Sequence, residues 1–291
     1  MIKKPKKYIK EWLTIKWSAV AIALMTAASA LITDVSHAQS TWQAIQDRGT
    51  LRIGVTQAPP WFTKDIRTGE WIGGLGVTLG KKMAETLDVE LEMVEVTWGT
   101  SIAALQSNKI DLMYFLSPTA SRAKVIDFTQ NPLAFISQAV MTAEGLDAST
   151  WSKLNNTDVS MSVPQATSMD QFLTRMAPDA DIQRFPDNAT SIAAFQSGRV
   201  DAVSLMLPPL LSARQKLGQG VISVPTPAFT APVNIGVRRE DDKTFRDWLD
   251  TTSLYWYETG RIQGWYEEFL IEFGVDPADS APIQRELILM R

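Results

Sequence analysis

Hydrophobic and polar residues along this chain form many short apolar runs and a few longer amphipathic stretches. The runs have the length of strands buried in a sheet. They cover residues 51–55, 112–116, 134–143, 159–163, 202–207, 221–224 and 233–238. Residues 89–96 begin by alternating apolar and acidic side chains, which predicts a half-exposed strand. Helical spacing over 243–257 predicts a helix closed by Gly260, and a second short helix should cover 262–269.

One twelve-residue segment occurs twice, ninety residues apart. Thr100–Asp111 reads TSIAALQSNKID and Thr190–Asp201 reads TSIAAFQSGRVD, with eight identical positions. In each copy Thr and Ser can cap a helix, a break follows, and the aspartate precedes a strand. With one more strand upstream of each copy, the order is that of a βαβ unit in a parallel sheet.

Two such units predict an α/β chain of two similar lobes, each a mainly parallel sheet flanked by helices. The piece after the second unit is too short for a third lobe, so it should return to the first, with two strands crossing between lobes. We expect lobe 1 to comprise 39–137 and 230–274, lobe 2 to comprise 138–229, and 275–291 to form a C-terminal tail. A ligand would lie in the crevice at the carboxyl ends of the strands.

The N-terminal 38 residues have the pattern of a secretion signal. Six lysines precede a 15-residue apolar run, Ser18–Ile32, and Ser36-His37-Ala38 follows. The run is shorter than the roughly 20 residues that cross a bilayer, so we expect cleavage after Ala38 and a periplasmic protein. An uncleaved N-terminal anchor is the alternative. A lipid anchor near this junction is excluded because the chain has no cysteine.

Composition excludes several classes of chemistry. The single histidine, His37, falls within the expected signal, and cysteine is absent. Cys-His or Ser-His catalysis, His/Cys zinc sites and disulfides are therefore not expected in the processed protein, and we expect no cofactor or metal. Cleavage of the expected signal removes six lysines and two acidic residues, which changes the net charge from −4 to −8. An acidic chain argues against binding to nucleic acid or anionic membranes.

Several motifs, in order, give the chain a family resemblance. They are Gly49–Val55, Pro59-Pro60-Trp61-Phe62, Leu105–Asp111, Ser117–Thr129 (SPTASRAKVIDFT) and Val163–Ser168 (VPQATS). Over roughly Trp42–Gly274 the chain resembles periplasmic solute-binding proteins of the amino-acid-binding type, family 3, the receptors of ABC importers. The resemblance implies the periplasmic-binding-protein fold with two crossover hinge strands, a ligand held between closing lobes, and delivery to a membrane permease.

The resemblance also implies a clamp for a carboxylate. Arg122, Ser117 and Thr119 in lobe 1 match the family's arginine and hydroxyl donors, and Thr167 and Ser168 match its lobe 2 contribution at a helix N-terminus. A guanidinium makes two-pronged hydrogen bonds to carboxylate, and a helix start offers unpaired N–H groups to the same charge. The alternative is that these hydroxyl residues only cap helices, beside an exposed arginine.

The sequence departs from the family where the ligand's ammonium group is usually bound. Met206 stands at the usually acidic end of the lobe 2 strand, and Thr56 stands where relatives often have aspartate. Because burying an unpaired ammonium costs several kcal/mol, an ordinary α-amino acid is not the expected ligand. Trp61, Trp98 and Phe115 with Met206 would suit a carboxylate with an apolar or aromatic body. Aromatic rings could instead hold a cation or simply pack in the core.

The expected function is a monomeric, non-enzymatic receptor that binds a small carboxylate, an amino acid or related organic acid, by hinge closure. Its partners would be this ligand and the permease subunits of an ABC importer, with no nucleic acid. One alternative is a periplasmic enzyme on the same scaffold, of the cyclohexadienyl or arogenate dehydratase type. Another is a sensory or accessory module.

Overall fold

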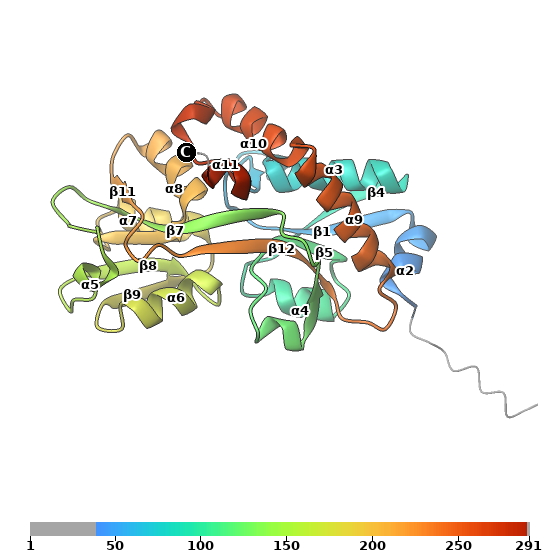
Figure 1. Ribbon diagram of the computed structural model, residues 1–291, viewed down its shortest axis with the longest axis horizontal. Coiled ribbons are helices and arrows are strands. Elements are labelled where there is room, and N and C mark those ends of the chain that lie inside the picture. Colours follow the sequence, from blue (N-terminus) through green and yellow to red (C-terminus); the bar gives the residue numbers. More distant parts are fainter. Residues whose placement is uncertain (1–38, 290–291) are drawn as a thin grey trace, which may run out of the picture. The chain divides into compact units, whose positions relative to one another are not determined.

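The computed structural model describes residues 39–289 as one α/β unit (Figure 1), and the expected signal segment lies outside this range. The strands are β1 (Thr50–Val55), β2 (Thr63–Lys64), β3 (Trp71–Gly73), β4 (Glu90–Glu95), β5 (Leu112–Leu116), β6 (Ile126–Phe128), β7 (Ala134–Thr142), β8 (Ser160–Pro164), β9 (Asp181–Phe185), β10 (Ala202–Met206), β11 (Val221–Ser223) and β12 (Thr230–Arg238). The α-helices are α2 (Thr41–Arg48), α3 (Leu75–Leu87), α4 (Ser101–Gln106), α5 (Trp151–Leu154), α6 (Ser168–Met176), α7 (Asn188–Gln196), α8 (Leu207–Leu217), α9 (Thr244–Glu258), α10 (Arg261–Glu272) and α11 (Arg285–Leu289). Two 3₁₀ turns are η1 (Arg122–Lys124) and η2 (Pro277–Asp279).

Two parallel groups of strands are joined through a pair of long antiparallel strands. The order is β4-β1-β5-β12-β7-β10-β8-β9, with β6 on β12 and β11 on β7. The group β4, β1, β5 is parallel, as is the group β10, β8, β9. The long strands β7 and β12 run side by side between the groups (Figure 1). The expected α/β fold of two lobes with two crossover strands is confirmed.

We call the β4-β1-β5 group with its helices lobe 1 and the β10-β8-β9 group with its helices lobe 2. The C-terminal helices return to lobe 1, because α10 packs against α3 and α9 against α2. The boundaries at 137/138, 229/230 and 274/275 stay a prediction. None of the helices between residues 39 and 289 has both the length and the apolar character of a membrane span.

The repeated segment forms the same motif twice, with a correction to the expected cap in each copy. In lobe 1 the helix α4 begins directly after Thr100, but the Thr100 side chain makes no capping hydrogen bond to it and instead bonds reciprocally with Thr97. In lobe 2 the helix α7 begins earlier, so Thr190 lies inside it, and Asp187 caps it by accepting from Thr190 N at 2.8 Å. The carboxylate is the stronger cap because it also accepts the Thr190 hydroxyl.

Strand β12 is longer than the apolar pattern predicts. It begins at Thr230, before the expected start at Val233, because Thr230–Val233 pairs with β7. Such pairing at a crossover satisfies backbone groups without requiring apolar side chains. The predicted half-exposed strand is β4, in which intermediate and exposed positions alternate at first.

Candidate functional site

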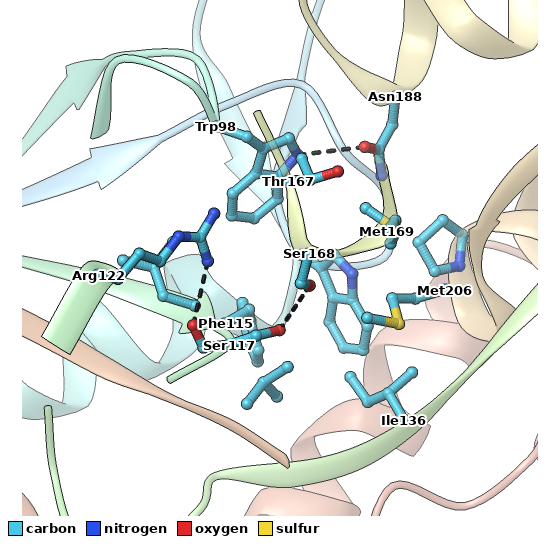
Figure 2. A pocket seen from close by; sticks show the side chains of 14 residues that line it. Trp98, Phe115, Ser117, Arg122, Ile136, Thr167, Ser168, Met169, Asn188 and Met206 are labelled. Atoms are coloured by element: carbon cyan, nitrogen blue, oxygen red, sulfur yellow. Dashed lines mark hydrogen bonds between the residues drawn. The ribbon is translucent and has the colours of Figure 1, made fainter. Parts of the chain in front are cut away.

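A small cavity lies at the junction of the two lobes and the crossover strands. Its volume of about 30 Å³ is room for about two water molecules. Lobe 1 and lobe 2 contribute six residues each, and β7 and β12 contribute one residue each. The cavity is lined by Trp61, Trp98, Phe115, Leu116, Ser117, Arg122, Ile136, Thr167, Ser168, Met169, Asn188, Met206, Pro209 and Val233. Eight of the nine residues expected at the site are therefore brought together (Figure 2).

A β-bulge places Phe115 in the cavity wall. Met113 pairs with Gly236 and Leu116 with Asn234, so two residues of β5 oppose one residue of β12. Phe115 has a φ of +61°, which is rare for an aromatic residue. Bulges re-aim side chains beside functional sites, and here the ring stacks on Trp61 with centroids 4.6 Å apart.

Trp61 serves both the core and the cavity. Its ring is stacked between Phe115 and Tyr266, whose centroid lies 6.1 Å away. The phenol of Tyr266 shares a 2.7 Å hydrogen bond with the hydroxyl of Ser280. This bond to the C-terminal segment helps to hold the Tyr266 ring in place against Trp61. Core packing and a lining role, which the sequence left as alternatives, therefore apply together at Trp61.

Arg122 brings a buried positive charge to the cavity. Its side chain donates from Nη1 to the Ser117 carbonyl and from Nη2 to the Ala166 carbonyl, both at 3.2 Å. Burial lowers the pKa of the Arg122 guanidinium from its ordinary value. No carboxylate of residues 39–289 forms an ion pair with it. Within the described residues the hydrogen bonds from this guanidinium go to two carbonyl oxygens, which leaves room for an anionic ligand as a stronger partner.

The start of helix α6 faces Arg122 from lobe 2. Thr167 caps this helix by accepting from Asp170 N at 3.1 Å, and its hydroxyl donates to the Pro164 carbonyl. Ser168 follows, and its hydroxyl shares a 2.8 Å hydrogen bond with the hydroxyl of Ser117 (Figure 2). The Thr167 hydroxyl is thus committed to the cap, while the serine pair joins the lobes directly and has capacity to bind a further oxygen.

Thr119 is the one expected site residue that does not line the cavity. Its hydroxyl lies 3.0 Å from that of Ser121 and accepts weakly from Arg122 N at 3.4 Å. Both contacts lie within the turn that leads into η1, from which Arg122 projects. The capping role and the direct ligand contact of Thr119 both stay predictions.

Six lining residues were not expected from the sequence. They are Leu116, Ile136, Met169, Asn188, Pro209 and Val233. Asn188 is the polar one, and its Oδ1 accepts from Trp98 Nε1 at 3.1 Å across the two lobes. An asparagine after an aspartate reads as part of a helix cap, so its pattern alone gives no ligand signal. The repeat could have found it, because Asn188 and Trp98 occupy equivalent positions ninety residues apart.

The cavity wall contains no acidic side chain. Met206, at the usually acidic strand end, is buried and lines the cavity, whereas Thr56 is buried away from it. No three acidic side chains gather closely enough within residues 39–289 to hold a metal ion. The site combines one guanidinium, a pair of hydroxyls, one amide and an apolar wall, which is a set of groups for binding an oxygen-bearing, largely apolar molecule.

Comparison with known families matches this chain to one of them over most of its length. The sequence model of bacterial extracellular solute-binding proteins, family 3, matches residues 51–272. Among curated proteins, the L-cystine-binding protein TcyJ of Escherichia coli K12 is 22% identical over 160 residues. That alignment spans 55% of this chain and 59% of the relative.

Solved structures show the same architecture. The ancestral amino acid-binding protein AncCDT-1, a precursor of cyclohexadienyl dehydratase, is 27% identical with a TM-score of 0.69, over 80% of this chain and 99% of that one. The substrate-binding protein AbpA from Streptococcus pneumoniae, bound to L-arginine, is 21% identical with a TM-score of 0.72, over 79% and 98% of the two chains. At that identity, AbpA supports the fold alone.

Proposed function

Because this chain belongs to the bacterial extracellular solute-binding proteins of family 3, we propose that it is the periplasmic receptor of an ABC importer for a small carboxylate with an apolar body. The observation that carries the ligand class is the buried, carboxylate-free environment of Arg122. A ligand carboxylate would supply the missing negative charge. An ammonium or guanidinium group would meet no counter-charge in the cavity wall, at a cost of several kcal/mol.

The contacts between lobes suggest how the ligand would be held. In the proposed complex the carboxylate lies between Arg122 of lobe 1 and the start of α6 in lobe 2, and it displaces the Ala166 carbonyl from the guanidinium. The serine pair, Ser117 and Ser168, donates to the same oxygens. Since both lobes then contact one ligand, binding shifts the population toward the closed arrangement that a permease would receive.

The relatives bind other ligands, and the cavity wall accounts for the difference we propose. TcyJ is named for L-cystine and AbpA is bound to L-arginine, and both ligands carry ammonium groups. In this chain Met206 occupies the strand end at which an acidic residue would receive such a group. The rings of Trp61 and Phe115 would contact the ligand's body, so apolar and aromatic acids are the proposed ligand class.

Calorimetric titration of the purified protein tests this function. We expect hexanoate or a substituted benzoate to bind more tightly than arginine, lysine or glutamine. Arg122→Ala should lower the affinity for the acid at least tenfold, because a hydrogen bond to a charged group contributes about 1.5–3 kcal/mol. The control is Arg214→Ala, which removes an exposed arginine of α8. Tight binding of a cationic amino acid, or unchanged acid affinity in Arg122→Ala, would refute the proposal.

The likeness to AncCDT-1 supports a second candidate, a dehydratase acting on cyclohexadienyl acids. Such a reaction needs a general acid, and the cavity wall described above offers no acidic side chain. Incubation with prephenate or arogenate, followed by absorbance of the aromatic product, separates the two functions. Turnover above that of Arg122→Ala would favour the enzyme over the receptor.

A further inference from the structure

Asn188 is a buried amide at the part of the cavity wall that lobe 2 supplies. Its side chain is 2% exposed and lies with the sulfur-bearing side chains of Met169 and Met206. It is the first residue of α7, directly after the capping residue Asp187. Because Asp187 already accepts the backbone N–H of Thr190, the Asn188 side chain is not needed as the cap.

The orientation of this amide follows from its partner. The indole Nε1–H of Trp98 is a donor only, so the atom that accepts it at 3.1 Å is the amide oxygen of Asn188. The NH₂ group is then on the other side of the amide, and Figure 2 shows it directed toward Met169. No hydrogen bond within residues 39–289 uses this NH₂ group, so its two N–H donors are unpaired at a part of the cavity wall that Met169 and Met206 also line.

We propose that the ligand carries a second oxygen acceptor, of the carbonyl type, which receives a hydrogen bond from the Asn188 amide. This inference rests on the proposed function, in which Arg122 binds the carboxylate. The guanidinium projects from lobe 1 and the amide from lobe 2, so the two polar groups of the ligand are joined by an apolar body that contacts the aromatic rings. The ligand class is thereby narrowed from apolar acids to oxo, acyl or amide derivatives of such acids.

The donor character of Asn188 also sets what this end of the cavity excludes. An ammonium group is a donor like the Asn188 NH₂ group, so the two could form no hydrogen bond with each other. An alkyl end would leave the amide donors unpaired after the cavity closes. A carbonyl oxygen satisfies one donor without adding charge. Trp98 acts as a positioning residue, because its indole N–H holds the amide with the NH₂ group toward the cavity.

Matched ligand pairs test the inference on the full-length processed protein. The pairs are 5-oxohexanoate with 5-methylhexanoate, and 4-acetylbenzoate with 4-isopropylbenzoate, so that within each pair a methyl group replaces the carbonyl oxygen and the shape changes little. By calorimetry we expect the oxygen-bearing member of at least one pair to bind about fivefold more tightly, the size of one neutral hydrogen bond. The measured quantity is the ratio of the two dissociation constants within a pair, and a general loss of folded protein would not change this ratio.

Two variants assign the preference to the amide. Asn188→Leu keeps the branched shape of the side chain and removes the donors, so the ratio of affinities within a pair should fall to about one. Trp98→Phe keeps an aromatic ring but frees the Asn188 oxygen to turn into the cavity, so the ratio should also fall. Thermal unfolding of each variant confirms that the protein is folded. Arg122→Ala should instead weaken both members of a pair equally.

The outcomes separate the two proposals. Equal affinity within both pairs, with binding that still depends on Arg122, would overturn the role of Asn188 and leave the proposed function standing. A preference that persists in Asn188→Leu would also overturn it. If none of the four acids binds at 10 mM while an amino acid does, the proposed function fails and this inference fails with it.

Discussion

The two copies of the repeated segment have the same local structure in two different environments. Asp111 in lobe 1 accepts the backbone N–H of Arg52 on β1, and Asp201 in lobe 2 accepts that of Ser160 on β8, both at 2.8 Å. Each aspartate therefore fastens the strand that follows it to the neighbouring parallel strand. This shared structural role accounts for an aspartate in both copies.

The surroundings of the two aspartates differ. The Asp111 side chain is fully buried and forms ion pairs with Arg48 at 2.5 Å and Arg52 at 2.7 Å. Asp201 is exposed, and its remaining contact is the hydroxyl of Ser160 at 2.6 Å. Equal sequences thus fix equal backbone contacts, whereas the energy of each contact depends on burial and on partners from elsewhere in the chain.

The largest expected difference comes from neutralising each aspartate. Asp111→Asn should lower the free energy of unfolding by about 3 kcal/mol, because two arginines lose their partner beside a buried site. Asp201→Asn should lower it by about 1 kcal/mol, the size of one exposed hydrogen bond. Urea denaturation measures both. Equal losses would contradict the view that burial separates the two copies.

A smaller difference is expected between the helix caps. In lobe 2, Asp187 and Thr190 bond reciprocally, and the equivalent Thr97 and Thr100 do so in lobe 1. Asp187→Ala should lower the free energy of unfolding by about 1 kcal/mol, and Thr97→Ala should lower it somewhat less, since α7 is longer than α4 and its cap is charged. Asp187→Ser is the matched control and should restore most of the loss in urea denaturation. A larger effect at Thr97 would reverse this ranking.

The smallest effect is a dependence of stability on pH at Asp201. Hydrogen bonds from the Ser160 side chain and backbone lower the pKa of the Asp201 carboxyl. The ionised Asp201 side chain therefore stabilises the folded protein fully above the unfolded pKa of about 3.9. This stabilisation is lost as the pH falls through the lower folded pKa. The stability difference between wild type and Asp201→Asn should shrink as urea midpoints are measured from pH 6 down to pH 3. A difference that grows toward acid would contradict the sign of the shift.

The repeat made much of the fold predictable from the sequence. Its helix, break, aspartate and strand recur in order, and those local signals place both parallel groups of strands. The strand ends were less predictable, as at Thr230, where pairing with β7 extends β12 beyond its apolar run. The left-handed backbone at Phe115 could not be anticipated either, because the bulge arises from the register between β5 and β12.

The candidate site was predictable where one motif carries it and not where two distant segments meet. The motif around Arg122 and the one around Ser168 pointed to residues that line the cavity, although Thr119 does not line it. Asn188 was missed because its significance depends on Trp98, a residue of the other lobe. No local pattern encodes such a pair, although their equivalence in the repeat is a signal that could be read.

By itself the sequence determined the family, the α/β architecture and eight of the residues that line the cavity, because motifs, periodicity and turns act within one segment of chain. Tertiary structure alone decided which way those side chains face, since that depends on contacts between lobes. It buries Arg122 without a carboxylate, and it turns the Asn188 amide by means of the indole of Trp98. Burial and partner geometry convert a list of polar residues into a candidate site for which one ligand class is proposed.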